Sequence, residues 1–432
     1  MSDARMFGTV TNTFSRLGVE RNAILNYGKL LTGQVGRLAF SLVYFLVLAN
    51  ALSLGDFGLF ATASAIGVTL SRLAAFGFVS PLYRTACQRP ALVGTYSLGY
   101  LVALILSLLP IAIIAWVLHV AFLSEIATTT FALVLFSEVV LWRTAEVVIV
   151  VNNGLQRFAR ASVAVVLNTA LRAIAALLFA YSASQELDAW AQYYACANGV
   201  MFVGTIAFLQ PRQRLRWAAR IWLARWRDAI GVASAEVLFY AQSELDKLLV
   251  LALGGNEVAG LYAIVMRLAD LTAIPLRSMM TLIVQRIMRL RGLGSSWRTW
   301  AAFEAGIFAV SAGAMTVLAI ALNWRPDALG ENVATASAFV AVVVLLPGFR
   351  NLVEFHTEIL YAFERTGERL YQLAVVGISK AALLALLLSK FDSFSNVAPW
   401  LNVAFAALYA LSAVYTYRTL ARTGFRTRPI AA

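Results

Sequence analysis

Long apolar runs separated by short polar segments make up most of the chain, and some runs carry no charge over their whole length, as from Pro90 to Ser124. About 20 consecutive apolar residues suffice for a helix to cross the hydrocarbon core of a bilayer. Only helices and closed barrels satisfy their backbone hydrogen bonds there. The pattern predicts an all-α polytopic membrane protein with about 12 transmembrane helices, at residues 28–54, 57–80, 94–118, 127–151, 161–182, 189–210, 229–253, 258–285, 299–322, 333–362, 370–389 and 398–417.

The basic residues outside these spans are distributed very unevenly. With a cytoplasmic N-terminus, 24 of them fall in cytoplasmic segments, while only Arg325 and Lys390 fall outside. An excess of Lys and Arg marks the cytoplasmic side of a membrane protein. We therefore expect both termini in the cytoplasm and the protein in the inner (plasma) membrane. Residues 38–51 also fit the core and Ala-Asn-Ala site of a signal peptide, but the long region before them favours a retained helix.

Composition excludes several classes of protein. The chain is 61% hydrophobic and 13% charged, whereas soluble domains are about 45–50% apolar and about 25% charged. The net charge of +13 follows from the topology, so no nucleic-acid partner is implied. The chain has only two cysteines and two histidines, too few for a usual metal site, and a histidine-based triad is nearly excluded. We expect no enzyme activity, no cofactor and no bound metal.

A short motif recurs six spans apart. Leu52–Ala61 closes the first predicted hairpin with Leu-Ser-Leu-Gly and then Gly-Leu-Phe-Ala, and Leu251–Ala263 closes the seventh with Leu-Ala-Leu-Gly and then Gly-Leu-Tyr-Ala. Six is even, so both copies have the same orientation. Parallel repeats of this kind occur in transporters. The repeat predicts two six-helix bundles, and the expected segments are a cytoplasmic N-terminus 1–27, bundles 28–210 and 229–417, a basic linker 211–228 and a cytoplasmic tail 418–432.

The linker is rich in arginine and contains Trp, Leu and Ile, which predicts an amphipathic helix on the cytoplasmic lipid surface. A plain topological anchor explains the same residues. Membrane lipids are expected partners in either case.

The chain resembles the polysaccharide flippases of the O-antigen and exopolysaccharide type, a branch of the multidrug/oligosaccharidyl-lipid/polysaccharide superfamily. The resemblance covers essentially the whole chain through span number, repeat and loop lengths. Its motifs are short, namely Gly33–Arg37, Leu54–Ala61, Ser71–Leu73, Phe76–Phe78, Gly260–Ala263, Arg267-Leu268 and Pro275. The resemblance implies alternating access between two bundles. It implies a polyprenyl-diphosphate-linked oligosaccharide as cargo, with a polysaccharide polymerase and export machinery as further partners.

Charged residues within the spans are the candidate site, because an ionisable group in the membrane must face a cavity or a partner. Arginine suits a diphosphate, since its planar fork binds oxygens bidentately. In the lipid II flippase of the same superfamily, cations of helices 1, 2 and 8 line the cavity, and this chain has arginines in those helices. The predicted substrate-binding residues are Arg37, Arg72, Arg143, Arg172, Arg267 and Arg277, and the candidates for coupling to a cation are Glu236, Glu244, Asp246 and Asp270.

Spacing also predicts ion pairs inside single helices, because residues three or four apart share a helix face. The expected pairs are Arg143–Glu146, Glu244–Lys247, Arg267–Asp270 and Arg350–Glu354.

Two other functions fit the span pattern. A cation-coupled antiporter of drugs or small molecules would place unpaired acids in the cavity, whereas the first span here carries Arg37 and no acid. A membrane-embedded polymerase or transferase would need paired acids at a membrane face or a large outer loop. Neither feature is evident in the sequence.

Overall fold

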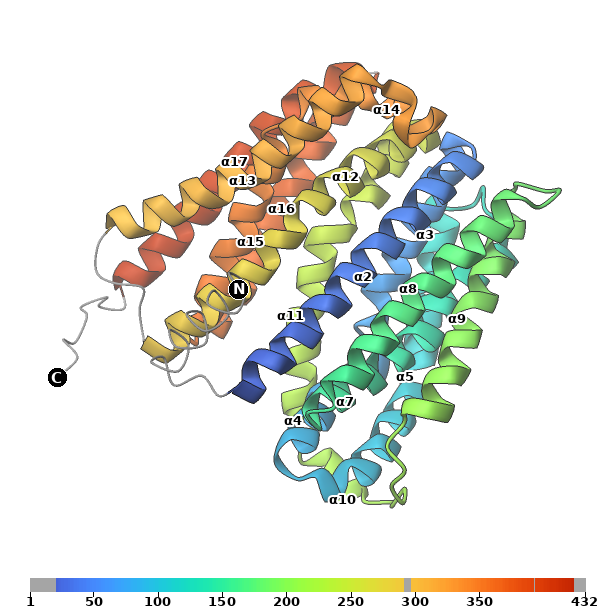
Figure 1. Cartoon of the computed structure of the whole chain (residues 1–432), viewed down its shortest axis with the longest axis vertical. Coiled ribbons are helices and arrows are strands. Elements are labelled where there is room, and N and C mark those ends of the chain that lie inside the picture. Colours follow the sequence, from blue (N-terminus) through green and yellow to red (C-terminus); the bar gives the residue numbers. More distant parts are fainter. Residues whose placement is uncertain (1–20, 291–296, 392, 423–432) are drawn as a thin grey trace, which may run out of the picture.

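The structure is a computed structural model that describes residues 21–290, 297–391 and 393–422, and these residues form helices and short connections with no strand. The predicted segments 1–27 and 418–432 lie largely outside the described residues. Figure 1 shows the blue-to-green helices on one side of the molecule and the yellow-to-red helices on the other. The first half holds α2 (Arg21–Ala51), α3 (Leu54–Ser71), α4 (Val79–Gln88), α5 (Val93–Phe122), α6 (Thr128–Phe136), α7 (Arg143–Gly154), α8 (Phe158–Ala180) and α9 (Leu187–Leu209).

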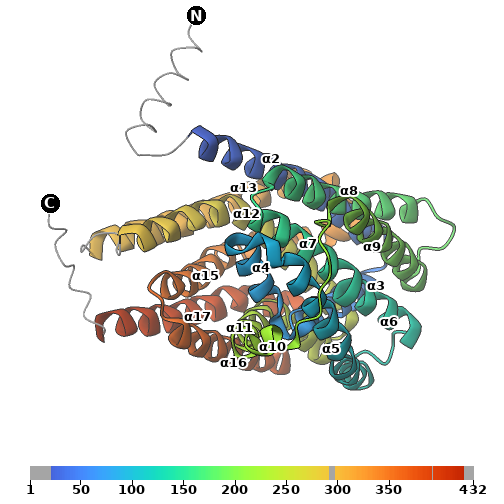
Figure 2. The same cartoon turned by 90° about the horizontal axis from the view of Figure 1, so that it is seen from below.

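We call these helices the N bundle. The short helix α10 (Ala219–Leu223) follows, and the C bundle then comprises α11 (Trp226–Glu244), α12 (Asp246–Leu290), α13 (Trp297–Trp324), α14 (Glu331–Val342), α15 (Leu346–Ala362), α16 (Thr366–Lys390) and α17 (Phe394–Arg422). Figure 2, seen from the end where α4 and α10 lie, shows the two bundles side by side, with α4 and α11 where they meet.

Every predicted span coincides with a helical segment, and the chain is a multi-pass membrane protein. Among the described residues, seven helices are long and apolar enough to cross a membrane, or eight if the bent pair α14 and α15 is one span. The number is below twelve in part because Trp226–Ala273, which holds one predicted span and much of the next, counts as one, and because the predicted span 127–151 is divided between α6, a π-helix and α7. The pair α14 and α15 is bent by 75°, and Pro347 lies in the first turn of α15. Pro275, by contrast, does not interrupt α12.

Two further breaks lie in the N bundle. Between α3 and α4, Ala75 and Phe76 have left-handed backbone angles, with φ of 55° and 49°, which L-residues rarely adopt. The N–H of Ala75 donates to the hydroxyl of Ser107, 2.9 Å away, and this bond helps to hold the break. Between α6 and α7, residues Ser137–Trp142 form a π-helix, a form often found at functional sites.

The repeated motif has a structural reason. α11 and the first turns of α12 reverse direction at Gly255, whose φ is +81°, and the rest of α12 then crosses α3. At the crossing, a Cβ on Gly260 would lie 2.1 Å from the carbonyl oxygen of Leu54, and one on Gly58 would lie 2.4 Å from that of Asn256. The two glycines of the repeat therefore pack against each other's turns, and their lack of a side chain lets the bundles touch.

Side-chain amides close the same end of the molecule. Asn50 of α2 donates 2.7 Å to the carbonyl of Leu329, and the side chain of Asn332 donates to the carbonyls of Ala49 and Leu52 at 2.7 and 2.8 Å. We call this end, with the turns at residues 51–54 and 325–331, the seam end. Each of these bonds joins one bundle to the other.

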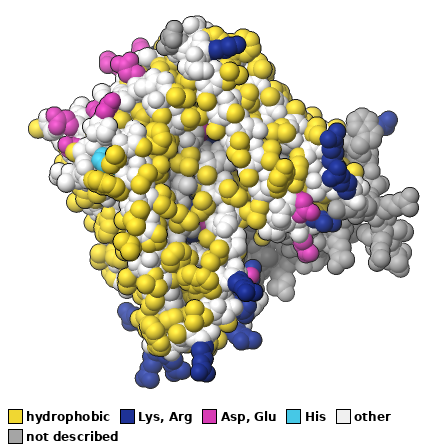
Figure 3. Space-filling view, turned by 180° about the vertical axis from the view of Figure 1, so that it is seen from behind, with side chains coloured by type: hydrophobic (Ala, Val, Ile, Leu, Met, Phe, Trp, Pro, Cys, Tyr) yellow, Lys and Arg dark blue, Asp and Glu magenta, His cyan; other side chains and the backbone are white. Residues whose placement is uncertain are grey.

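The two ends of the molecule differ in charge. Figure 3 shows Lys and Arg gathered at the end opposite the seam, with most of the visible Asp and Glu towards the seam end and an apolar surface between them. At this arginine-rich end, Arg84 of α4 and Asp228 of α11 form an exposed ion pair of 2.6 Å. The distribution is the one that the positive-inside pattern predicts.

The linker is not the amphipathic helix predicted for it. Residues 211–218 contain no helix, and only Ala219–Leu223 form a short one. Its first arginines, Arg212, Arg214 and Arg216, are spaced by two, the period of an extended chain rather than of a helix. Pro211 also disfavours a helical conformation for the residue before it, and Gln210 is extended.

Candidate functional site

Two adjoining cavities, of about 550 and 530 Å³, lie between the bundles. The first extends into the C bundle towards α15, α16 and α17, and the second extends into the N bundle towards α3, α7, α8 and α9. Both are bounded by α2, α11 and α12, through Arg37, Ser41, Tyr240, Glu244, Arg267 and Asp270. Together they form one central, strongly polar space.

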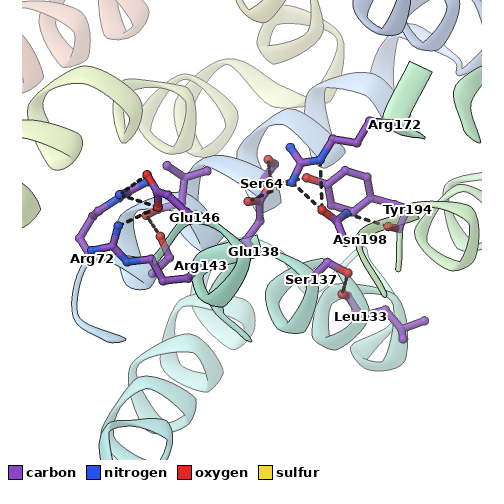
Figure 4. Close-up of polar contacts among 12 residues, drawn as sticks. Ser64, Arg72, Leu133, Ser137, Glu138, Arg143, Glu146, Arg172, Tyr194 and Asn198 are labelled. Atoms are coloured by element: carbon purple, nitrogen blue, oxygen red, sulfur yellow. Dashed lines mark hydrogen bonds and ion pairs between the residues drawn. The ribbon is translucent and has the colours of Figure 1, made fainter. Parts of the chain in front are cut away.

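Arg72 and Arg143 hold one carboxylate between them (Figure 4). Arg72 ends α3 and is buried; its Nη1 lies 3.1 and 3.0 Å from the two carboxylate oxygens of Glu146. Arg143 contacts the same carboxylate at 2.7 Å, as its spacing predicts, and Glu236 of the C bundle at 3.1 Å. Arg72 also stacks on the ring of Tyr240, 4.2 Å from its centre. This network ties the two bundles together at the wall of the cavity.

Arg172 lies in a second cluster of the N bundle, also drawn in Figure 4. Its guanidinium donates to the side-chain oxygen of Asn198 at 2.7 and 3.1 Å and lies 3.7 Å from the carboxylate of Glu138. Glu138 sits in the π-helical segment and also accepts from Ser64 and Tyr194. The bulge of the π-helix thus carries the carboxylate that faces Arg172.

In the C bundle, Asp246 lies behind Lys380. The Lys380 ammonium is 2.5 Å from the Asp246 carboxylate and donates to the carbonyl of Gln242. Tyr262 donates to Asp246 from across the hairpin at 2.7 Å. Both charges are almost fully buried, so each depends on the other for its stability in the membrane.

Two of the four predicted intrahelical pairs are present, Arg143–Glu146 and Glu244–Lys247. The other two expectations are wrong. Asp270 pairs with Arg350 of α15 at 3.0 Å, and Arg267 donates at 2.5 Å to the hydroxyl of Ser41 in α2. Partners on neighbouring helices lie closer to these groups than the residues one turn away, and sequence spacing contains no information about them.

The lining of the two cavities is rich in cations. It includes seven basic residues, Arg37, Arg72, Arg172, Lys247, Arg267, Arg350 and Lys380, and five acidic ones, Glu138, Glu146, Glu244, Asp270 and Glu354. Among the described residues, the formal charge of the lining is therefore +2. Glu138, Glu146, Glu244 and Asp270 each lie within 4 Å of an Arg or Lys nitrogen.

Comparison with known proteins identifies the architecture. No family model matches the chain, and no curated protein matches it. Solved structures do match: an inward-facing multidrug resistance MATE transporter of the MOP superfamily has a TM-score of 0.58 at 13% identity, over 90% of this chain and 98% of that one. The chain has the fold of the MATE transporters.

Two other MATE-fold structures are similar over comparable lengths. The multidrug transporter DinF-BH in complex with rhodamine 6G has a TM-score of 0.56 at 12% identity, covering 93% of this chain and 97% of that one. A MOP-superfamily transporter from Pyrococcus furiosus, described for the reverse polarity of its binding pocket, has a TM-score of 0.56 at 13% identity over 92% and 95%. They confirm the predicted fold of two repeated bundles.

On this MATE fold, most predicted site residues meet at the central space. Arg37, Arg72, Arg172 and Arg267 line it, as do Glu244 and Asp270. Arg143 and Glu236 belong to the network at its wall, and Asp246 lies behind Lys380. Arg277 is part of α12, but its side chain lies outside the described residues.

The predicted site residues left out several groups of the lining. Tyr240, Glu138 and Arg350 were not among the candidates, although each meets a predicted residue. Glu138 and Arg350 carry the same signal as the others, a charge inside a span, so weighting every such charge would have found them. Tyr240 carries no such signal, because aromatic residues are common in these helices.

A polar cluster inside the C bundle was also missed. The Glu304 carboxylate of α13 accepts from His356 of α15 at 3.0 Å, from Tyr409 of α17 at 2.6 Å and from Tyr417. The other ring nitrogen of His356 lies 3.1 Å from the hydroxyl of Ser412. His356 is fully buried, and one acidic side chain therefore joins three helices.

We expect Glu304→Leu to destabilise the protein by about 3 kcal/mol, because it leaves the buried His356 and the half-buried Tyr409 and Tyr417 without their shared acceptor. Thermal unfolding in detergent should show a Tm lower by roughly 5 °C. Glu304→Gln keeps one acceptor oxygen and should fall between this variant and the parent. Glu331→Leu, at an exposed helix start, is the control. Equal Tm values for the two Leu variants would show that the Glu304 cluster does not stabilise the C bundle.

Proposed function

We propose that the chain is an alternating-access transporter, not an enzyme, and that its cargo is an anionic amphiphile, a polyprenyl-diphosphate-linked oligosaccharide. The observation that carries this proposal is the excess of cations in the lining of the central space. Arg37 and Arg267 line both cavities, and arginine forks match the oxygens of a diphosphate. A hydrated, charged space between the bundles suits the sugar, while the polyprenyl tail stays in lipid.

The orientation proposed from the arginine distribution fits export. With the arginine-rich end in the cytoplasm of a cell whose inside is negative, an anionic cargo moves outward down the electrical gradient. Each elementary charge gains about 2.3 kcal/mol per 100 mV. The product would feed surface or exopolysaccharide synthesis, with a polymerase and export machinery acting on it outside.

A cation-coupled antiporter of drugs is the second candidate, and the comparisons favour it over the flippase. The similar structures include multidrug transporters, one of them in complex with rhodamine 6G. Glu244 and Asp270 at the central space would then be the groups that exchange a cation against the drug. The charge of the lining supports the first candidate, because these acids are already engaged by Lys247 and Arg350.

Reconstituted vesicles test both candidates with the same protein. We expect a fluorescent polyprenyl-diphosphate oligosaccharide to become accessible to a membrane-impermeant quencher on the far side, and Arg37→Gln with Arg267→Gln to slow this at least tenfold. Arg325→Gln, outside the central space, is the control. Transport of rhodamine 6G, with no movement of the lipid-linked sugar, would refute the anionic cargo and establish the antiporter.

A further inference from the structure

A third cavity lies away from the central space, within the N bundle towards the arginine-rich end. Its volume is about 350 Å³, and it is lined by α4, α5, α7, α9 and the start of the linker. Val147, Val148 and Val151 of α7 form much of its wall, and Tyr100 and Thr144 contribute hydroxyls. Binding pockets for small molecules begin at about 300 Å³, so this cavity suits part of a ligand rather than an oligosaccharide.

The cavity reaches the surface that faces the hydrocarbon. Leu101 of α5 and Ile206 of α9 line it and are 37% and 39% exposed. Further along the same faces, Ile105 and Val203 are largely exposed, as expected of side chains in contact with lipid tails. A molecule that enters between α5 and α9 therefore comes from the bilayer.

The linker is fixed across the mouth of this cavity. The Gln213 side chain accepts from the N–H of Gly94 at 2.9 Å and donates to the carbonyl of Pro90 at 2.9 Å. A Cβ on Gly94 would lie 2.4 Å from the carbonyl oxygen of Arg214, so only glycine admits the linker this closely. Trp222 is buried against α5, with its indole N–H on the carbonyl of Thr95.

The fixed position of the linker places exposed arginines beside the apolar opening of the cavity. Arg212 lines the cavity, Arg214 and Arg216 follow it along the linker, and all three are exposed. Leu215 lies between them and also lines the cavity, and Trp217 is 70% exposed. Basic groups at a membrane surface attract anionic headgroups, and Trp prefers the interface between lipid and water.

We propose that this cavity binds an anionic phospholipid of the leaflet at the arginine-rich end. One acyl chain occupies the space between α5 and α9, and the phosphate lies on Arg212, Arg214 and Arg216. The site is separate from the central space, so it stands whichever cargo is transported. It gives the linker a task beyond topology, because the bound lipid joins the linker to the N bundle.

Lipid binding to the purified full-length protein tests the proposal. Native mass spectrometry in a neutral detergent would count bound phosphatidylglycerol, with phosphatidylcholine as the uncharged comparison. We expect preferential binding of phosphatidylglycerol, weakened at least tenfold by Ala207→Trp, which fills the cavity. The triple variant Arg212→Gln, Arg214→Gln and Arg216→Gln should weaken it as much while leaving the cavity intact.

The control is a second triple variant, Arg89→Gln, Arg157→Gln and Arg160→Gln. It removes the same charge from exposed positions at the same end, and binding should change less than threefold. An equal loss of phosphatidylglycerol binding in both triple variants would show that the basic surface attracts the lipid without a specific site, and it would overturn the proposal. Displacement of phosphatidylglycerol by an equimolar polyprenyl diphosphate would overturn it too, because the cavity would then hold the tail of a cargo.

Discussion

Gly260→Ala is expected to prevent closure of the seam end and to reduce transport at least tenfold, without preventing the chain from folding. The added Cβ would lie 2.1 Å from the carbonyl oxygen of Leu54. A backbone atom cannot swing aside as a flexible side chain can, so α3 and α12 must move apart. Only states in which these helices are separated accommodate the methyl group, and the population shifts towards them.

Disulfide formation measures this closure independently of any cargo. In a background with Cys87→Ser and Cys196→Ser, the pair Asn50→Cys and Asn332→Cys should cross-link readily, because the two asparagines are in contact. Adding Gly260→Ala should lower the yield at least fivefold, and Gly58→Ala should act in the same direction.

The matched control is Gly204→Ala, where a Cβ would meet no atom within 4 Å. This change should leave the cross-link intact and raise stability by up to about 1 kcal/mol, since alanine favours a helix over glycine. An unchanged cross-link in Gly260→Ala would show that the glycine crossing does not limit closure.

Lys380→Met should cost about 3–5 kcal/mol of stability, the largest loss that we expect from one charge. The substitution leaves Asp246 buried with only Tyr262 and a backbone N–H as donors, and an unpaired buried charge is strongly destabilising. Chemical unfolding in mixed micelles, followed by tryptophan fluorescence, would measure the loss. Lys390→Met at the exposed end of α16 should change stability by less than about 0.5 kcal/mol.

The double variant Lys380→Met with Asp246→Leu separates a structural pair from a coupling site. Replacing both charges by apolar groups is often neutral, but the Tyr262 hydroxyl loses its acceptor, so the double variant should recover most, not all, of the stability lost in Lys380→Met. If the pair is structural, any dependence of transport on a cation gradient stays unchanged in the double variant. Loss of that dependence in a stably folded double variant would instead assign Asp246 the coupling role predicted for it from sequence.

Hydropathy and repeat spacing were sufficient for the fold, since a bilayer leaves the chain few alternatives. Hydropathy identified even the broken spans. The π-helix at Ser137–Trp142 and the left-handed turn at Ala75 interrupt the helical hydrogen bonding, but they do not make the sequence less apolar. Such breaks depend on contacts with other helices, as with the hydroxyl of Ser107. Local propensity therefore could not predict them.

The candidate site was predictable only as a set of charges. Arg72 has no close acid in its own helix, which left a partner on another helix, water or a substrate anion as possibilities, and nothing in the sequence pointed to Glu146. Asp270 had a suitable arginine one turn away and pairs instead with Arg350. Inside a bundle, the nearest neighbour across helices decides a pairing, and that neighbour is set by how the helices rotate and cross.

The two ends of the molecule differ in their response to dissolved ions. At the arginine-rich end, the Arg84–Asp228 pair is about half exposed on both sides, and mobile ions screen exposed pairs over about 10 Å at 0.1 M. At the seam end, the bonds of Asn50 and Asn332 join uncharged amides to carbonyls, and salt does not screen them. In the alternating-access transporter proposed above, raising the ionic strength therefore weakens the Arg84–Asp228 contact and not the asparagine bonds of the seam end, so salt biases which side of the membrane the protein opens to.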